Sequence, residues 1–152
     1  MADTQRKTDY LEEHLPYMLK MVRYTHGQMQ QKQHYLSWNA HFESFAVNAR
    51  NLMNFLSNGD RGNMKAHDFV ENGFKARVQD AERLLLKLAQ QVFHLAELRP
   101  KTPVGKFNSD HAAEVLEWID KNFAIFLDAL APEQRASGQS LTLGTCSAAT
   151  NR

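Results

Sequence analysis

The chain is poor in cysteine: its 152 residues include only one, Cys146. A single thiol excludes an intrachain disulfide, which small secreted domains commonly use in place of a large core. A chain of this length buries a sufficient core without disulfides or a structural metal. We therefore expect one domain, residues 1–135, in a reducing compartment, which we interpret as the cytoplasm.

Glycine and proline are also scarce, with seven and four residues respectively. Because both interrupt regular structure, their scarcity favours long helices over many short strands joined by tight turns. No apolar run approaches the roughly 20 residues that a membrane-spanning helix needs. The polar segment 1–8 lacks the apolar stretch of a signal peptide. These absences predict a protein without a membrane partner.

An excess of charge of one sign is missing as well. Eighteen Lys and Arg residues face seventeen Asp and Glu residues, which gives a formal net charge of +1. Tight nonspecific binding of nucleic acid through bulk electrostatics is therefore not expected. Any contact with nucleic acid would have to depend on a local group of residues.

Apolar residues recur three and four positions apart in four segments, at about 10–31, 36–57, 75–98 and 109–131. This spacing places them on one face of a helix. Four such stripes predict an all-α fold, an antiparallel bundle of four long helices. A short helix is expected within the 60–73 connection, and residues 136–152 have the composition of a flexible tail.

Local signals mark some of the helix ends. Pro16 predicts either a kink or a restart of the first helix. Ser37 is a candidate N-cap of the second helix, and Asn58 followed by Gly59 is a strong stop signal. Pro132 ends the last helix.

Polar residues form a second row beside two of the apolar stripes. On the second helix the row is Asn39, Glu43, Val47, Arg50 and Asn54, with Asn51 next to it. On the third helix it is Arg83, Lys87, Gln90 and His94, with Gln91 on its flank. Each row borders an apolar stripe, so these side chains are expected to be partly buried.

Three interpretations of these rows are open. They are a solvated helix flank with a Glu43–Arg50 ion pair, a buried network that sets the helix register, or a functional site. In a site, His94 would exchange a proton near neutral pH. Lys87 or Arg50 would hold a phosphate. This combination suits phosphodiester chemistry or nucleotide binding.

The polar rows on the second and third helices overlap a known sequence pattern. The chain reads Asn39-Ala40-His41-Phe42-Glu43-Ser44-Phe45, then Ala49-Arg50-Asn51-Leu52 and Phe55-Leu56, and later Lys87 followed after six residues by His94-Leu95. These stretches resemble small bacterial helical proteins and are similar to the Arg-x4-6-His motif of the HEPN superfamily. Lys87 stands where that motif has arginine, and lysine lacks the planar fork of a guanidinium group.

The resemblance implies a helical bundle, often dimeric, that binds RNA or cleaves it without metal in a defence or stress system. It implies a site in which His94 is the acid or base. Lys87 or Arg50 would stabilise the phosphorane charge, and Glu43 would orient them. Three further residues are assigned to ligand binding: Asn51, Asn54 and Gln91. The alternative is a non-catalytic interaction module that binds a nucleotide, a protein partner or a second copy of the chain.

Metal and cofactor sites are not predicted. The seven histidines include no pair three or four positions apart on one helix, so the local zinc signature is absent. A site assembled from separate helices, such as His41 with His94, is the remaining metal alternative. A further candidate surface combines aromatic and basic residues, namely Tyr17, Tyr24 and Tyr35 with Arg23.

Overall fold

The structure is a computed structural model that describes residues 2–59, 64–71, 73–76, 80–92, 107–132 and 134–135. These residues contain helices and connecting segments and no strand, which confirms the all-α prediction. In chain order the elements are α1 (Ala2–Asp9), the π-helix η1 (Tyr10–His14), α2 (Leu15–Met29), α3 (Tyr35–Ser57), the 3-10 helix η2 (Ala66–Phe69), α4 (Ala81–Val92) and α5 (Ser109–Ala129). None of the described helices is both long and apolar enough to cross a lipid bilayer.

The first helix passes through Pro16 instead of ending at it. Proline has no N–H group and its ring crowds the carbonyl four residues before it. The chain accommodates this by widening into η1, where the N–H of Leu15 donates to the carbonyl of Tyr10, five residues back. Leu11, Leu15 and Pro16 are all buried. The helix also begins at Ala2, eight residues before the predicted start.

The second helix, α3, has the predicted extent but a different cap at its start. The N-cap is His34, whose Nδ1 accepts a hydrogen bond from the N–H of Leu36, so the prediction of Ser37 is wrong. Trp38 adds a link between helices, because its Nε1 donates to the carbonyl of Met29 at the end of α2.

The predicted stop after Ser57 is confirmed. Asn58 adopts the left-handed conformation, with φ of 58°, which asparagine tolerates better than most residues. Its side chain also joins two other segments. Oδ1 accepts from the N–H of His67 at 3.1 Å, and Nδ2 donates to the carbonyl of Phe74 at 3.1 Å.

The third helix begins later than predicted. Residues 73–76 are not helical, and α4 begins at Ala81 instead of near Lys75. The apolar residues there serve another purpose: the buried ring of Phe74 packs edge-on against Phe126 of α5. The predicted end of this helix, residues 93–98, and the predicted tail, residues 136–152, lie outside the described residues.

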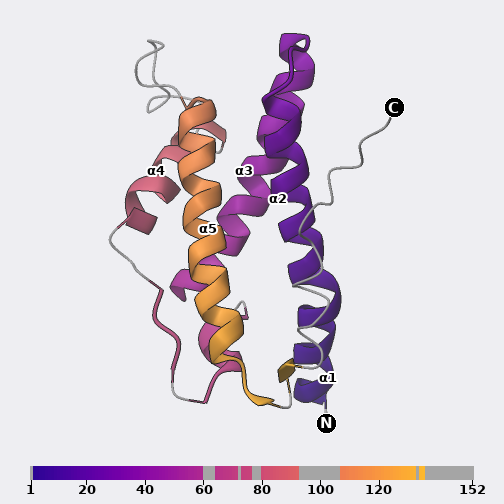
Figure 1. The fold of residues 1–152 in the computed structure, drawn as a ribbon, viewed down its shortest axis with the longest axis vertical. Helices are drawn as coiled ribbons and strands as arrows, with labels where there is room; N and C mark the ends of the chain where they lie inside the picture. Colours follow the sequence, from indigo (N-terminus) through magenta and orange to yellow (C-terminus); the bar gives the residue numbers. More distant parts are fainter. Residues whose placement is uncertain are drawn as a thin grey trace.

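Figure 1 shows α2, α3 and α5 side by side along the long axis, with α4 beside α3 and α5. Cross-helix contacts give the directions. Pairs such as Tyr24 with His41 make α2 antiparallel to α3. Phe107 packs on Phe42 near the start of α3, and Phe126 packs on Phe55 near its end, so α5 runs parallel to α3. Two ion pairs, Arg23–Asp120 at 2.8 Å and Arg83–Glu114 at 3.0 Å, join α2 and α4 to α5.

Phe45 tests the assignment of the buried face of α3, because its side chain has no exposed surface. Phe45→Asp would bury an unpaired carboxylate at a cost of several kcal/mol, which is comparable to a total stability of about 5–15 kcal/mol. We expect loss of the helical circular-dichroism signal at room temperature. Val47→Asp on the exposed side of the same helix is the control and should melt close to the wild type. A Phe45→Asp protein with a wild-type melting temperature would contradict the packing.

Asn58 tests the link between the end of α3 and residues 67 and 74. Asn58→Gly keeps the left-handed backbone and loses two side-chain hydrogen bonds, each with a net contribution of about 0.5–1.5 kcal/mol. Asn58→Ala loses the same bonds and adds the strain of a Cβ in that conformation, about 1–2 kcal/mol. The free energy of unfolding in urea should therefore be highest for the wild type, lower for Asn58→Gly and lowest for Asn58→Ala. Equal stability of the two variants would exclude the backbone contribution.

Candidate functional site

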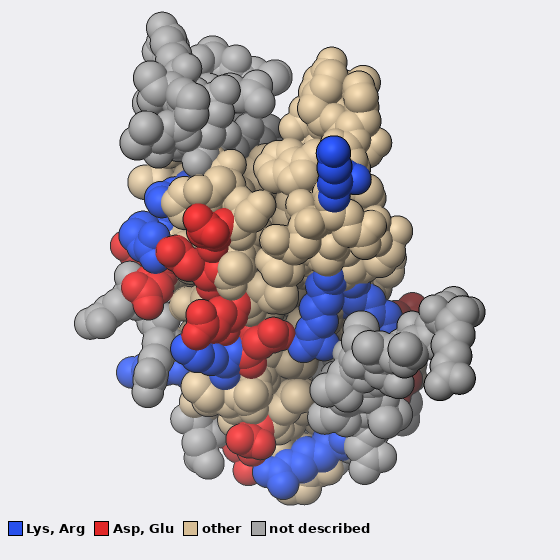
Figure 2. Space-filling view, turned by 45° about the horizontal axis from the view of Figure 1, so that its top comes forward, with Lys and Arg blue, Asp and Glu red and all other residues tan. Residues whose placement is uncertain are grey.

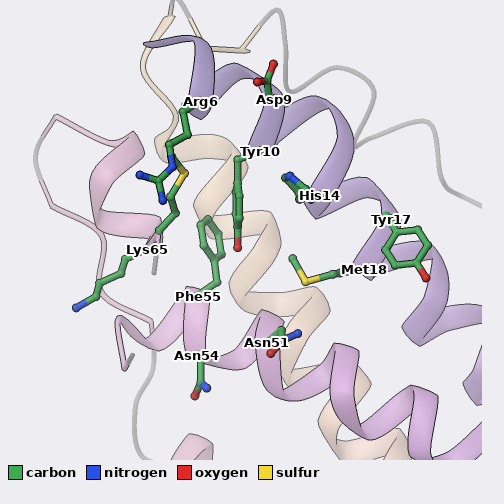
Figure 3. Close-up of a pocket in the computed structure, with 11 residues that line it drawn as sticks. Arg6, Asp9, Tyr10, His14, Tyr17, Met18, Asn51, Asn54, Phe55 and Lys65 are labelled. Carbon is green, nitrogen blue, oxygen red and sulfur yellow. The ribbon is translucent and has the colours of Figure 1, made fainter. Parts of the chain in front are cut away.

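A cavity of about 470 Å³ lies where the N-terminal helix faces the end of α3. One wall is formed by α1, η1 and the first turn of α2. The opposite wall is α3, and the side is closed by the segment that leads into η2. Figure 3 shows Arg6, Tyr10 and His14 projecting from the N-terminal helix toward this space, with Asn51 and Phe55 on α3 below.

An aromatic floor holds Tyr10 in place. The Tyr10 ring centroid lies 5.6 Å from that of Phe55 and 6.0 Å from that of Phe69. Burial raises the pKa of the Tyr10 phenol above its ordinary value. Tyr10 therefore keeps its proton at neutral pH, so its hydroxyl can donate a hydrogen bond to a ligand.

Two cationic residues line the cavity from separate segments. Arg6 comes from α1, and Lys65 comes from the segment before η2. Within the residues that the structure describes, neither forms an ion pair. The lining also contains one carboxylate, Asp9, whose Oδ1 accepts a hydrogen bond from Nε2 of Gln5 at 2.7 Å. The lining thus has a local excess of positive charge.

Polar and aromatic groups complete the lining. Asn51 and Asn54 contribute amides that can both donate and accept hydrogen bonds. His14, on the exposed side of η1, has its ring centroid 5.5 Å from that of Tyr10. Tyr17 is 60% exposed at the far end of the group from Lys65 (Figure 3). Two cations, an exposed aromatic ring and two asparagines therefore belong to the lining of one cavity.

Of the seven residues predicted from the sequence, the two asparagines lie in this cavity. Arg50, on the neighbouring position of α3, is half-buried and is not part of the lining. The expectation of partly buried rows is wrong for the positions that are exposed, namely Asn39, Glu43, Val47, Asn51 and Arg83. Gln91 lies in the last turn of α4, and its side chain lies outside the described part, as does His94 as a whole.

Lys87 has a different neighbourhood. Its Nζ lies within hydrogen-bond distance of Nε2 of His111, in the first turn of α5. The other ring nitrogen of His111, Nδ1, lies 3.2 Å from the backbone N–H nitrogen of Asn108, while Oδ1 of Asn108 accepts from the N–H of His111 at 3.0 Å. This reciprocal cap starts α5. In the described part of the chain, no hydrogen bond or ion pair joins Lys87 to Glu43.

Burial, and next the charge of Lys87, lower the pKa of His111 below its ordinary value. Only the neutral ring has a nitrogen that can accept a hydrogen bond, so both effects favour a ring that accepts from one of its two neighbouring donors, Lys87 or the N–H of Asn108. Lys87 and His111 thereby attach α4 to the start of α5. This contact assigns Lys87 a structural role in the packing of these two helices.

Sequence reasoning missed Arg6, Tyr10, His14 and Lys65 as site residues. Arg6 lies in a segment that was not predicted to be helical, and Lys65 lies in a connection. Arg6, Tyr10 and His14 follow one another at intervals of four residues, but no local motif joins them to Lys65 or to the asparagines of α3. Among the described residues, no group of three His, Cys, Asp or Glu side chains is placed to hold a metal ion.

A comparison of the chain with protein-family models, with curated proteins and with solved structures finds no match.

Proposed function

We propose that this protein binds RNA through the cavity between the N-terminal helix and α3. The observation that supports this most directly is that Arg6 and Lys65 line the same cavity as Tyr17 and two asparagines. Guanidinium and ammonium groups hold phosphates. An exposed tyrosine ring stacks with a base, and amides hydrogen-bond to base edges.

The size of the cavity agrees with such a ligand. Sites for small organic ligands typically measure about 300–1,000 Å³, and this cavity measures about 470 Å³. It is partly open to solvent, and Tyr17 in its lining is 60% exposed. One nucleotide of a longer strand can therefore occupy it while the rest of the strand continues over the surface.

The face of α4 and α5 is unfavourable to a polyanion. In Figure 2 acidic side chains gather over α4 and α5. Exposed carboxylates on α5 include Asp110, Glu114 and Glu117. This face repels a polyanion. The net charge of +1 thus conceals a surface on which the cations of the cavity are separated from most of the acidic residues of α5.

The resemblance to HEPN proteins supports the same class of ligand, and a HEPN-like bundle in a defence or stress system is part of this proposal. We place binding ahead of cleavage, because Lys87 contacts His111 and does not line the cavity. The site of His94, Lys87, Arg50 and Glu43 stays a prediction of the sequence.

The second candidate function is a non-catalytic module that contacts a protein partner or a second copy of the chain. It is favoured by two large apolar side chains at the start of α3, Tyr35 and Leu36, which are 66% and 59% exposed. Such side chains contribute to interfaces when they are covered. A homodimer through this end of the molecule leaves the cavity open.

Removal of one cation tests the proposed binding site. Arg6→Gln and Lys65→Gln should each weaken binding of a fluorescently labelled single-stranded RNA several-fold in an anisotropy titration. Each should also lower the slope of log Kd against log salt by about 1, because one fewer counterion is released. Lys121→Gln is the matched control, since Lys121 is exposed and pairs with Glu117 on the acidic α5 face.

An unchanged Kd and salt slope in both cavity variants would contradict the proposal. Equal weakening by Lys121→Gln would show that binding depends on overall charge and not on the cavity.

The predicted cleavage is tested separately with structured RNA in EDTA. If the protein is a metal-independent nuclease that depends on His94, the wild type should cut RNA. The His94→Ala variant should then lose this activity while its helicity is unchanged. From the contact between Lys87 and His111 we expect binding without cleavage by either protein. Cleavage by the wild type alone would instead establish His94 as part of an active site.

A further inference from the structure

Two tyrosines on α2 share a face that continues from the cavity. Tyr17 lines the cavity, and Tyr24 lies seven residues later in the same regular helix. Seven residues make nearly two full turns, so the two side chains point in the same direction. Both are largely exposed, at 60% and 58%. Large aromatic rings that are this exposed present open faces for stacking.

A cation lies between the two rings. Lys20 is three positions after Tyr17 and four before Tyr24, the two spacings at which helix side chains are neighbours. It is exposed and forms no ion pair with the residues that the structure describes. Arg23, on another face of α2, is instead paired with Asp120 at 2.8 Å. Lys20 thus has the charge available for a phosphate.

The ring of Tyr24 is supported from α3. It meets the ring of His41 edge-on at a centroid distance of 6.3 Å. Nδ1 of His41 lies 3.1 Å from Oε1 of Gln33, and Nε2 of Gln33 donates to the carbonyl of Gln28 at 2.7 Å. Because the side chains that contact Tyr24 are themselves fixed, less conformational entropy is lost when a base stacks on it.

From this arrangement we infer that the RNA-binding site extends from the cavity along α2, over Tyr17, Lys20 and Tyr24, and selects single-stranded RNA. This inference rests on the proposed function and specifies its substrate. Bases reach aromatic rings only when they are free of a duplex, whose bases are stacked on one another. Alternation of aromatic rings with cations is the usual arrangement of single-strand sites.

The helix geometry sets the length of RNA. A rise of 1.5 Å per residue separates Tyr17 from Tyr24 by about 10 Å along the axis. A strand anchored by its phosphate at Arg6 and Lys65 therefore has to extend beyond the cavity to reach Tyr24. A dinucleotide held in the cavity does not reach it, whereas an oligonucleotide of about eight nucleotides does, within the range of known single-strand sites.

The test compares these two RNAs on Tyr24→Ala. The oligonucleotide should bind this variant about fivefold more weakly or worse, as expected for the loss of one stacked base. The dinucleotide should bind it as it binds the wild type. Tyr24→Phe, which keeps the stacking face, should restore binding of the oligonucleotide. Lys20→Gln should weaken it several-fold and lower the salt slope by about 1.

Two controls make the result specific. Tyr35→Ala removes a tyrosine of similar exposure, 66%, that is not on this face, and should have no effect. A hairpin RNA of the same length should bind more weakly than the single strand and show no dependence on Tyr24. Circular dichroism and melting of each variant check that this exposed position leaves the fold intact.

The outcomes separate the two proposals. If Tyr24→Ala binds the oligonucleotide like the wild type while Arg6→Gln still weakens it, the extension along α2 is wrong and the cavity stands. If the wild type binds neither RNA, both proposals fail. Equal binding of hairpin and single strand would overturn the selectivity.

Discussion

The missing N–H group of Pro16 determines the geometry of the N-terminal helix, and the proposed site depends on that geometry. A regular α-helix would place the carbonyl of Glu12 against the proline ring. The chain instead forms η1, in which the N–H of Leu15 bonds to the carbonyl of Tyr10. One additional residue in a turn rotates the helix on its N-terminal side by about 100° relative to the helix on its C-terminal side.

This rotation explains why two tyrosines at the same heptad spacing have different environments. Tyr10 and Tyr17 would share a face in a regular helix. Across η1, Tyr10 turns toward Phe55 and Phe69, and Tyr17 remains 60% exposed. The buried side chains of Leu11 and Leu15 fix this register against the core. The cavity is therefore lined both by the packed phenol of Tyr10 and by the exposed ring of Tyr17.

The side of the cavity that the segment before η2 closes depends on the left-handed turn at Asn58. Its amide binds the backbone of η2 and of Phe74. The carboxylate of Asp68 then accepts from the N–H of Lys65 at 2.8 Å and orients the residue that brings the second cation. A turn that ends a helix therefore also positions a binding side chain. The sequence signal for the turn is strong because few residues tolerate a positive φ.

The range of each interaction decides which parts of the molecule are predictable from the sequence. The apolar stripes of α2, α3 and α5 and the end of α3 at Asn58 were predictable, because helix periodicity and turn chemistry are local. The start of α4 was not, since Phe74 belongs to an aromatic cluster with Phe126 that only the tertiary fold creates. The cavity was not predictable for the same reason: Arg6, Asn51 and Lys65 have no fixed spacing in the chain. The motif that contains Asn51 also contains Lys87 and His94, yet Asn51 faces the N-terminal helix.

Lys87 shows why residue type and spacing alone do not identify a catalytic group. A lysine near a histidine suits phosphate chemistry in a sequence. In the structure its neighbour is His111, which also lies against the N–H of Asn108. A neutral imidazole has one accepting nitrogen, so the ring accepts either from that N–H or from Lys87, and only a bond from Lys87 joins α4 to the start of α5. Among the described residues Arg6, Lys20 and Lys65 form no ion pair, and Arg6 and Lys65 line the same cavity as the exposed ring of Tyr17.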